Sequence, residues 1–392
     1  MKSPPGFGRP RFDIADIVRA ERPGLEAQGL LSSAQRRALS AIEVCRTAAL
    51  GGHVDVCRSC GYEHPAYNSC RNRHCPKCQG LAQEKWITAR SERILPVRHF
   101  HVVFTLPAEL RPLARFAPEK VFAALFHAAS KTLLELGASR LHAQLGATMV
   151  LHTWTRDLRF HPHMHAIVTA GGFDAERGAW QPSSKNYLFP IEVMGELLRG
   201  KMMSALRRLH ADGVFARFDA FDDPEGFDRL MEKIAKKKWL VYAKKPFREA
   251  RHVLEYLGRY THRVAISNSR LVSATKHAVI FRTKNGETVT LPPDEFVRRF
   301  AQHVLPDGFH KIRHYGLYAG RHAESTLTVV RQLLRPDQID HAERPETWQA
   351  HLERLTGRDV DACPRCGGKL EHVPIERPAS ISNRGPPKTE AA

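Results

Sequence analysis

The stretch at residues 160–168, which reads FHPHMHAIV, constrains the fold of this chain more than any other. In an extended strand successive side chains point to opposite faces, so His161, His163 and His165 would share one face. The residues between them are apolar and can pack against helices. Pro162 cannot donate to a β-ladder, so it predicts an edge or a bulge that displaces His161 from the common face. We therefore expect a strand with one histidine face and one buried face.

Several imidazoles on one strand face are typical of a metal site, because neutral rings can share one divalent cation whereas charged rings repel each other. His152 lies on a neighbouring expected strand, at about residues 147–155. Antiparallel pairing would place it beside His163 or His165. The candidate ligands of a catalytic metal are therefore His163 and His165, with His161 or His152 as further ligands. The alternative is the polar outer face of a half-exposed strand.

Hydrophobic periodicity places the other elements. Helices are expected at about residues 35–46, 81–93, 118–136, 191–211, 248–262 and 292–303. Strands are expected at about residues 98–106, 147–155, 160–169 and 236–247, and a hairpin at 270–291 turns at Asn285-Gly286. Hairpin-like strand pairs mixed with helices predict an α+β fold built on an antiparallel sheet.

The eight cysteines are clustered, which indicates metal binding rather than a disulfide framework. Cys57-x2-Cys60-x14-Cys75-x2-Cys78 has close to the spacing of a structural zinc site. In such a site two thiolate pairs close a tetrahedron around Zn²⁺ and contribute folding energy. The sequence therefore predicts a small zinc-stapled module near the N-terminus, either as a DNA reader or as a purely architectural unit.

Further ligand-type residues lie outside this pattern. Three of them are close to the cluster and could replace one cysteine or hold a second metal: His53, Cys70 and His74. Cys363 and Cys366 form half of another site, for which His372 is a third candidate ligand. The sequence does not complete this second site.

The charge balance favours an acidic polymer as partner. The chain has 60 Lys and Arg against 41 Asp and Glu, a net charge of +19. Binding of such a basic surface to a nucleic acid is favoured because it releases the counterions condensed on the phosphates. A membrane surface is the alternative partner, but we find no long basic helix with an aromatic face and no apolar stretch of membrane-spanning length. We expect DNA as partner, no membrane association, and a cytoplasmic location.

Clustered basic residues are candidate DNA contacts. Those in the cysteine loop are Arg71, Arg73 and Lys77, and those beside the aromatic residues Trp239 and Tyr242 are Lys244 and Lys245. Basic residues with aromatic neighbours suit a groove for single-stranded DNA, in which bases stack and phosphates pair with cations.

A downstream segment offers a nucleophile. Tyr256 and Tyr260 are spaced i, i+4 and would share one face of a helix, while Arg259 and Arg263 share another face and could hold phosphates. Tyrosine can attack as a covalent nucleophile, but its pKa near 10 requires help from a metal that polarises the phosphate. The alternative is a tyrosine pair that serves packing alone.

The histidine run followed by Tyr-x-x-x-Tyr resembles the HUH endonucleases, and is most similar to the two-tyrosine transposases of the insertion-sequence 91 family. The similar segments are SCRNRHCPKCQ at 69–79, HVVFTLP at 101–107, LHTW at 151–154, LRFHPHMHAIVTAGG at 158–172, WLVYAKKPF at 239–247 and EYLGRYTHRVAISN at 255–268. This resemblance implies that His163 and His165 are the motif histidines and that Tyr256 and Tyr260 are the nucleophiles. It also implies Mg²⁺ or Mn²⁺, a single-stranded DNA substrate and a 5′-phosphotyrosine intermediate.

The resemblance implies a transposase that nicks and rejoins single-stranded or hairpin ends of a mobile element in rolling-circle-like transposition. We divide the chain into a helical and zinc-binding module at 1–95, an HUH catalytic domain at 96–330 and a C-terminal extension at 331–392. Two alternatives stay open. One is a plasmid or phage replication initiator or relaxase with the same chemistry, and the other is a non-catalytic zinc-dependent DNA-binding regulator.

Overall fold

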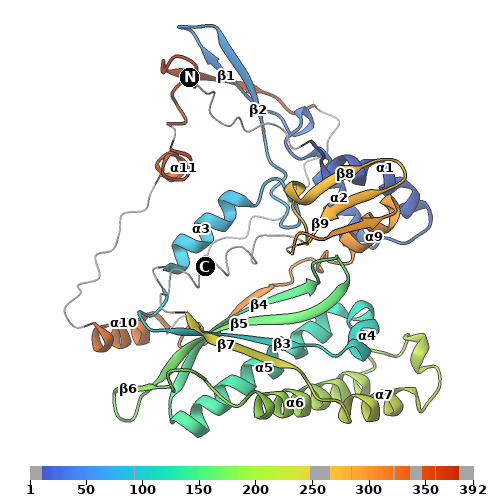
Figure 1. The fold of residues 1–392 in the computed structure, drawn as a ribbon, viewed down its shortest axis with the longest axis vertical. Coiled ribbons are helices and arrows are strands. Elements are labelled where there is room, and N and C mark those ends of the chain that lie inside the picture. The colour runs from blue at the N-terminus through green and yellow to red at the C-terminus, as the bar shows by residue number, and fades with distance from the viewer. Residues whose placement is uncertain are drawn as a thin grey trace.

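The computed structural model describes residues 11–91, 93–247, 265–283, 285–320, 323–335, 347–357 and 359–378. Three antiparallel sheets and the helices around them make up this part of the chain, which confirms the expected α+β fold. In Figure 1 the largest sheet lies over a layer of helices, a second helical body with a small sheet sits beyond its other face, and a narrow ribbon projects at the far end. No helix among the described residues is long and apolar enough to span a bilayer.

The central sheet has six strands in the order β11-β4-β5-β3-β7, with β6 paired to β5. Their bounds are β3 (His99–Thr105), β4 (Gln144–Trp154), β5 (Phe160–Asp174), β6 (Ala179–Pro182), β7 (Val241–Phe247) and β11 (Ile312–Gly316). The expected strand at 160–169 is confirmed and continues to Asp174. The long hairpin β4–β5 therefore forms the middle of the sheet and carries the histidine run.

The register of this hairpin shows the bulge that Pro162 predicts. His152 pairs with His163, whereas Trp154 pairs with Phe160, so β5 has one more residue than β4 across this interval. A strand that accommodates an extra residue bends and loses its regular alternation there. The alternation is restored beyond the bulge, where Met164 is fully buried on the apolar face.

Helices cover that apolar face. They are α4 (Arg111–Phe116), α5 (Pro118–Leu141), α6 (Ile191–Ala211) and α7 (Gly226–Ala235). Phe122 and Phe126 of α5 pack in one cluster with Met164, and Met202 of α6 belongs to the same cluster. Figure 1 shows α5 and α6 running side by side beneath the sheet. This core fixes the backbone of β5, so the opposite, histidine-bearing face has a rigid base.

A second core joins segments far apart in the sequence. It is built from α1 (Ile14–Ala27), α2 (Ser33–Val44), β8 (Leu271–Ala274), β9 (Val279–Arg282), β10 (Thr288–Leu291) and α9 (Pro293–Ala301). Ser32 caps α2 in a capping box with Gln35. Ile14 of α1 and Phe300 of α9 are fully buried in the same cluster. The expected hairpin at 270–291 is confirmed and has a third strand, β8.

The ribbon is a three-stranded sheet in the order β12-β1-β2, made of β1 (Gly52–Cys57), β2 (Tyr62–Tyr67) and β12 (Leu370–Ile375). The remaining helices are α3 (Gly80–Ser91), α10 (Ala323–Leu334) and α11 (Trp348–Thr356). Because β12 pairs with β1, segments more than 300 residues apart in the sequence share one sheet. The division of the chain at residues 95 and 330 stays a prediction.

Candidate functional site

Three histidines from β4 and β5 lie together on the face of the central sheet that faces away from α5. His152 and His163 are direct cross-strand partners, and His165 follows two residues further along β5. One ring nitrogen from each residue lies within 4.8 Å of those of the other two. The ring centroids of His152 and His165 are 4.4 Å apart. The expectation that strand pairing brings His152 to the motif histidines is therefore confirmed.

The local contacts leave His163 with a nitrogen for a ligand. Its Nδ1 lies 2.7 Å from the carbonyl oxygen of His161, which can only accept, so Nδ1 carries the proton and donates. In the neutral ring Nε2 then has a free lone pair. Burial lowers the pKa of His163 to about 4, outweighing that carbonyl, and burial also holds the pKa of His165 well below 6.5. Both rings are therefore neutral near pH 7, as a metal ligand requires.

His101 of β3 contacts the ring of His165. Nε2 of His101 lies 2.8 Å from Nδ1 of His165, and the two rings are stacked with an interplanar angle of 11°. This hydrogen bond fixes the orientation of the His165 ring. A second imidazole that fixes the tautomer and orientation of a ligand in this way is a common outer-shell feature of metal sites.

His161 lies outside this group, which corrects its place among the expected ligands. Its Nδ1 is 2.6 Å from Nη2 of Arg111, and a guanidinium can only donate, so Nδ1 is the acceptor. The neutral ring then carries its proton on Nε2, which leaves neither nitrogen free for a metal. The bulge at Pro162 is the physical cause, because it turns His161 out of the row that His163 and His165 form.

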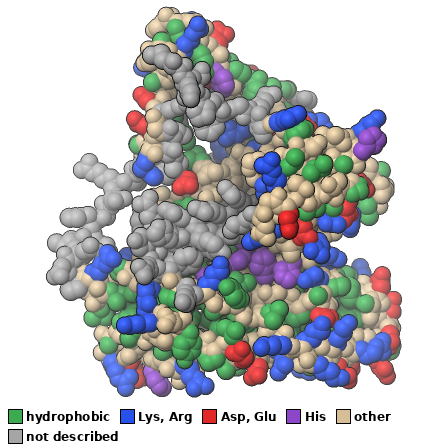
Figure 2. Space-filling view, in the orientation of Figure 1, with side chains coloured by type: hydrophobic (Ala, Val, Ile, Leu, Met, Phe, Trp, Pro, Cys, Tyr) green, Lys and Arg blue, Asp and Glu red, His purple; other side chains and the backbone are tan. Residues whose placement is uncertain are grey.

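Cations flank the histidine face. Lys244 of β7 pairs in register with His101, and its charge lowers the pKa of both His101 and His165 after the larger effect of burial. Arg111 stands at the opposite end, beside His161. Figure 2 shows histidine side chains gathered between the two halves of the molecule with Lys and Arg side chains next to them. Neutral imidazoles can bind a metal ion, and the Lys and Arg side chains beside them can bind the same phosphate that the metal ion contacts.

Part of the expected site falls outside the described residues. These residues are Tyr256, Arg259, Tyr260 and Arg263, together with the expected helix at 248–262. Lys245 lies within β7, but only its backbone is described. The tyrosine nucleophiles therefore stay a prediction.

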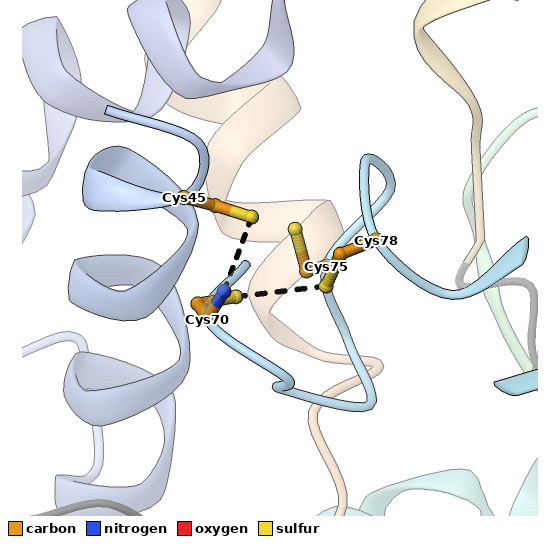
Figure 3. Close-up of side chains that lie close together, drawn as sticks. All are labelled: Cys45, Cys70, Cys75 and Cys78. Carbon is orange, nitrogen blue, oxygen red and sulfur yellow. Dashed lines mark hydrogen bonds between the residues drawn. The ribbon is translucent and has the colours of Figure 1, made fainter. Parts of the chain in front are cut away.

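A first cysteine group ties the end of α2 to the loop before α3. Its members are Cys45, Cys70, Cys75 and Cys78, whose Sγ atoms all lie within 4.8 Å of one another. Figure 3 shows the four side chains converging from these two segments. The Sγ atoms of Cys70 and Cys78 are 3.8 Å apart. Tetrahedral zinc with bonds of about 2.3 Å to sulfur separates its ligands by about 3.8 Å, so the group fits Zn²⁺.

The structure regroups the zinc ligands that the sequence suggests. Cys57 and Cys60 do not join Cys75 and Cys78. They lie instead with Cys363 and Cys366 in a second group whose Sγ atoms are within 4.8 Å of one another. The cause is the chain path, because β1 and β2 carry the first pair out along the ribbon, away from the loop that holds the second pair.

The other ligand-type residues have separate places. Cys70 completes the first group, as the sequence left open. His74 is buried, and its Nε2 accepts from Nε of Arg73 at 3.2 Å, so it lies outside both cysteine groups. His372 lies with His53 on the ribbon, where both rings pair with one aspartate.

Two of the expected DNA contacts in the cysteine loop are engaged within the chain. The Arg73 guanidinium donates to the carbonyl oxygens of Pro306 at 2.7 Å and Leu305 at 3.4 Å. Lys77 Nζ pairs with Asp13 at 3.1 Å, and only 15% of its side chain is exposed. Through these contacts Arg73 and Lys77 hold the loop against its neighbours, and their role as DNA contacts stays a prediction. Arg71 is exposed and keeps its place as a candidate.

Sequence reasoning missed Cys45 and His101. Cys45 has no partner at a knuckle spacing, and it reaches the group only because α2 ends against the loop. His101 had a weak signal, since its strand position alternates with the apolar residues of HVVFTLP. Neither could be assigned without knowing which strands and loops are neighbours.

Two family models match the chain. The family described as "Putative transposase" matches residues 146–326, which include the hairpin that carries the histidines. The family described as "Transposase zinc-binding domain", of insertion-sequence 91 type, matches residues 17–106, which include six of the cysteines. The cysteines at 363 and 366 lie outside both matches.

Two curated relatives match over most of their length. A protein of Sinorhizobium fredii (strain NBRC 101917 / NGR234) named "Putative transposase y4qJ" is 41% identical over 368 residues, 90% of this chain and 92% of the relative. The "Transposase for insertion sequence element IS801" of Pseudomonas savastanoi pv. phaseolicola is 31% identical over 360 residues, 88% of this chain and 85% of the relative. No solved structure matches the chain.

Proposed function

The chain belongs to the IS91-type family of transposases, and from that premise we propose that it cuts and rejoins single-stranded DNA through a phosphotyrosine intermediate. The observation that carries this proposal is the convergence of His152, His163 and His165, each with a ring nitrogen within 4.8 Å of the others. A DNA-binding protein without chemistry has no need for three converging imidazoles, two of them buried, with Lys244 and Arg111 at either end.

These three imidazoles would hold Mn²⁺ or Mg²⁺. When bound, that cation acts as a Lewis acid that polarises the scissile phosphate. Among the described residues this histidine group includes no carboxylate. Nitrogen ligands favour Mn²⁺ over Mg²⁺, so we expect Mn²⁺ to bind more tightly. Zinc belongs to the cysteine groups, whose thiolate ligands prefer a softer metal.

The proposed reaction is a transesterification in which Tyr256 or Tyr260 supplies the nucleophile. The phenol oxygen forms a bond to phosphorus while the bond from phosphorus to the 3′ oxygen breaks, and the phenol proton ends on the released 3′-hydroxyl. The number of phosphoester bonds is unchanged, so the reverse step can join the 5′ end to a new 3′-hydroxyl without an external energy source. Two tyrosines would allow two such transfers in succession.

The chain path supports this assignment. β7 lies beside β3 in the central sheet, and its Lys244 pairs with His101 next to the metal ligands. Tyr256 follows Phe247, the last residue of β7, by nine residues (256 − 247). An extended chain of that length spans at most about 30 Å, which limits how far the phenol can lie from the end of β7.

We propose that Arg71, Lys244, Lys245 and the arginines at 259 and 263 contact the DNA backbone. The substrate would be the single-stranded or hairpin ends of the mobile element, met in the cytoplasm. In this proposal the histidine-bearing domain at 96–330 and the zinc-binding module before it have separate roles.

A nicking assay tests the proposal. Single-stranded oligonucleotides that carry the element ends are incubated with the full chain and Mn²⁺, and a covalent adduct is sought by mass spectrometry. We expect cleavage and a phosphotyrosine adduct, both lost in the Tyr256→Phe/Tyr260→Phe double variant with DNA binding retained. Tyr242→Phe, which alters an exposed phenol on β7, is the matched control and should cleave normally.

Each alternative gives a different result. DNA binding without cleavage by the wild-type chain would indicate a non-catalytic regulator. Cleavage of a plasmid origin in preference to element ends would indicate a replication initiator or relaxase. Unchanged cleavage by the double tyrosine variant would refute the proposed mechanism.

A further inference from the structure

We propose that Cys57, Cys60, Cys363 and Cys366 hold a second zinc ion, which clasps the C-terminal strand β12 onto the N-terminal hairpin β1–β2. Sγ of Cys57 lies 3.5 Å from Sγ of Cys366, and Sγ of Cys60 lies 3.7 Å from Sγ of Cys363. The edge of a tetrahedral zinc–thiolate site is about 3.8 Å, as follows from zinc–sulfur bonds of about 2.3 Å. The four sulfurs are therefore spaced for a closed structural site.

The two cysteine pairs have the same local geometry. Each pair is followed by a glycine with positive φ, Gly61 at +69° and Gly367 at +76°. The N–H of Gly61 donates to the carbonyl of Cys57 at 3.0 Å, and the N–H of Gly367 donates to that of Cys363 at 2.8 Å. Glycine adopts this left-handed conformation without steric cost, so each turn presents both thiols on one side. Two matching turns facing each other are the usual construction of a four-cysteine zinc site.

Backbone pairing aligns these turns. β12 pairs with β1 over six residues, from Gly52 opposite Ile375 to Cys57 opposite Leu370. The ladder therefore ends at Cys57, where the two turns meet. On the face of this ladder, His372 Nδ1 lies 2.8 Å from Asp55 of β1, which adds a cross-strand hydrogen bond.

The ribbon needs such a clasp because its apolar core is small. The buried residues of its cluster are Cys57, Cys363 and Leu370, with Cys60 and Tyr62 packed against them. A two-stranded hairpin is at best marginally stable alone, and so small a core adds little. Metal binding by thiolates supplies folding energy directly, so zinc would decide whether β12 stays docked. The inference is independent of the proposed DNA chemistry.

Cobalt substitution tests the site, because bonds between Co²⁺ and thiolate sulfur give an intense near-ultraviolet charge-transfer band that imidazole sites lack. The full chain is prepared with Co²⁺ in place of Zn²⁺. We expect the Cys363→Ser/Cys366→Ser variant to show half the band intensity of the wild type and to retain one thiolate-bound zinc per chain instead of two. Arg365→Ala, inside the same turn but not a ligand, is the matched control and should match the wild type.

A second measurement does not depend on folding of the variant. Hydrogen exchange of the wild-type chain is followed before and after zinc is removed with a chelator. We expect the amides of β12 at 370–375 to lose protection, while those of β4 and β5 in the central sheet keep theirs. One thiolate-bound zinc in the wild type, two in the double cysteine variant, or β12 protection unchanged without metal would each overturn the proposal.

Discussion

Protonation of His163 and His165 should weaken the binding of Mn²⁺ at the histidine site little between pH 7.5 and 5.5. An imidazole with the ordinary pKa of 6.5 is about 9% neutral at pH 5.5, so one such ligand weakens binding roughly tenfold and two weaken it roughly 100-fold. Burial instead lowers the pKa of His163 to about 4, at which the ring is still about 97% neutral at pH 5.5. The pKa of His165 is lowered in the same direction.

The direction of the pH dependence follows from the protonation state of histidine that the fold favours. A lowered histidine pKa keeps the metal-binding neutral form down to lower pH, so affinity is lost only as the pH falls towards 4. Free Mn²⁺ is measured by electron paramagnetic resonance in a titration at each pH. The His163→Ala/His165→Ala variant provides the background from other sites. A loss of roughly 100-fold by pH 5.5 would show that both imidazoles titrate normally and would refute the assignment of buried, neutral ligands.

Three further outcomes follow from the same geometry. His152→Ala should weaken Mn²⁺ binding at least tenfold, whereas His161→Ala should leave it within about twofold, in the same titration. Arg73→Ala removes a charged donor to backbone carbonyls and should lower stability by about 2–4 kcal/mol, seen as a lower melting temperature. Gly316→Ala should lower the melting temperature more than Gly320→Ala: both have positive φ, but only at Gly316 would the added Cβ lie 1.8 Å from a carbonyl oxygen of β4. Equal effects in either matched pair would contradict the packing described.

The central hairpin could be predicted from the sequence because its signals are local. Alternation at 160–169 predicts the strand, and the short link at 156–159 favours antiparallel pairing with the strand before it. Pro162 marks the bulge, since a residue without an N–H cannot continue the ladder. These features place His152 beside His163 or His165 before any tertiary contact is known, and the register pairs it with His163.

The zinc ligands could not be predicted in the same way. Cys-x2-Cys spacing identifies the two members of a pair but not which pair they meet, since that depends on contacts between distant segments. Cys60 and Cys363 are 303 residues apart, and their meeting depends on the pairing of β12 with β1. The CxxCG pattern shared by Cys57–Gly61 and Cys363–Gly367 was the available signal, because equal turns are suited to face each other.

The same long-range contacts join segments that precede the central sheet in the sequence to segments that follow it. Helices α1 and α2 pack with residues 265–301 in one core, and β1 pairs with a strand beyond residue 369. The second core therefore cannot form until residues on both sides of the histidine sheet have been made, which raises the contact order of the fold. The expected tyrosine segment at 248–262 joins β7 of the histidine sheet to this second core at Ala265. The stretch of chain expected to carry the nucleophiles is therefore anchored to the histidine sheet on one side and to the second core on the other.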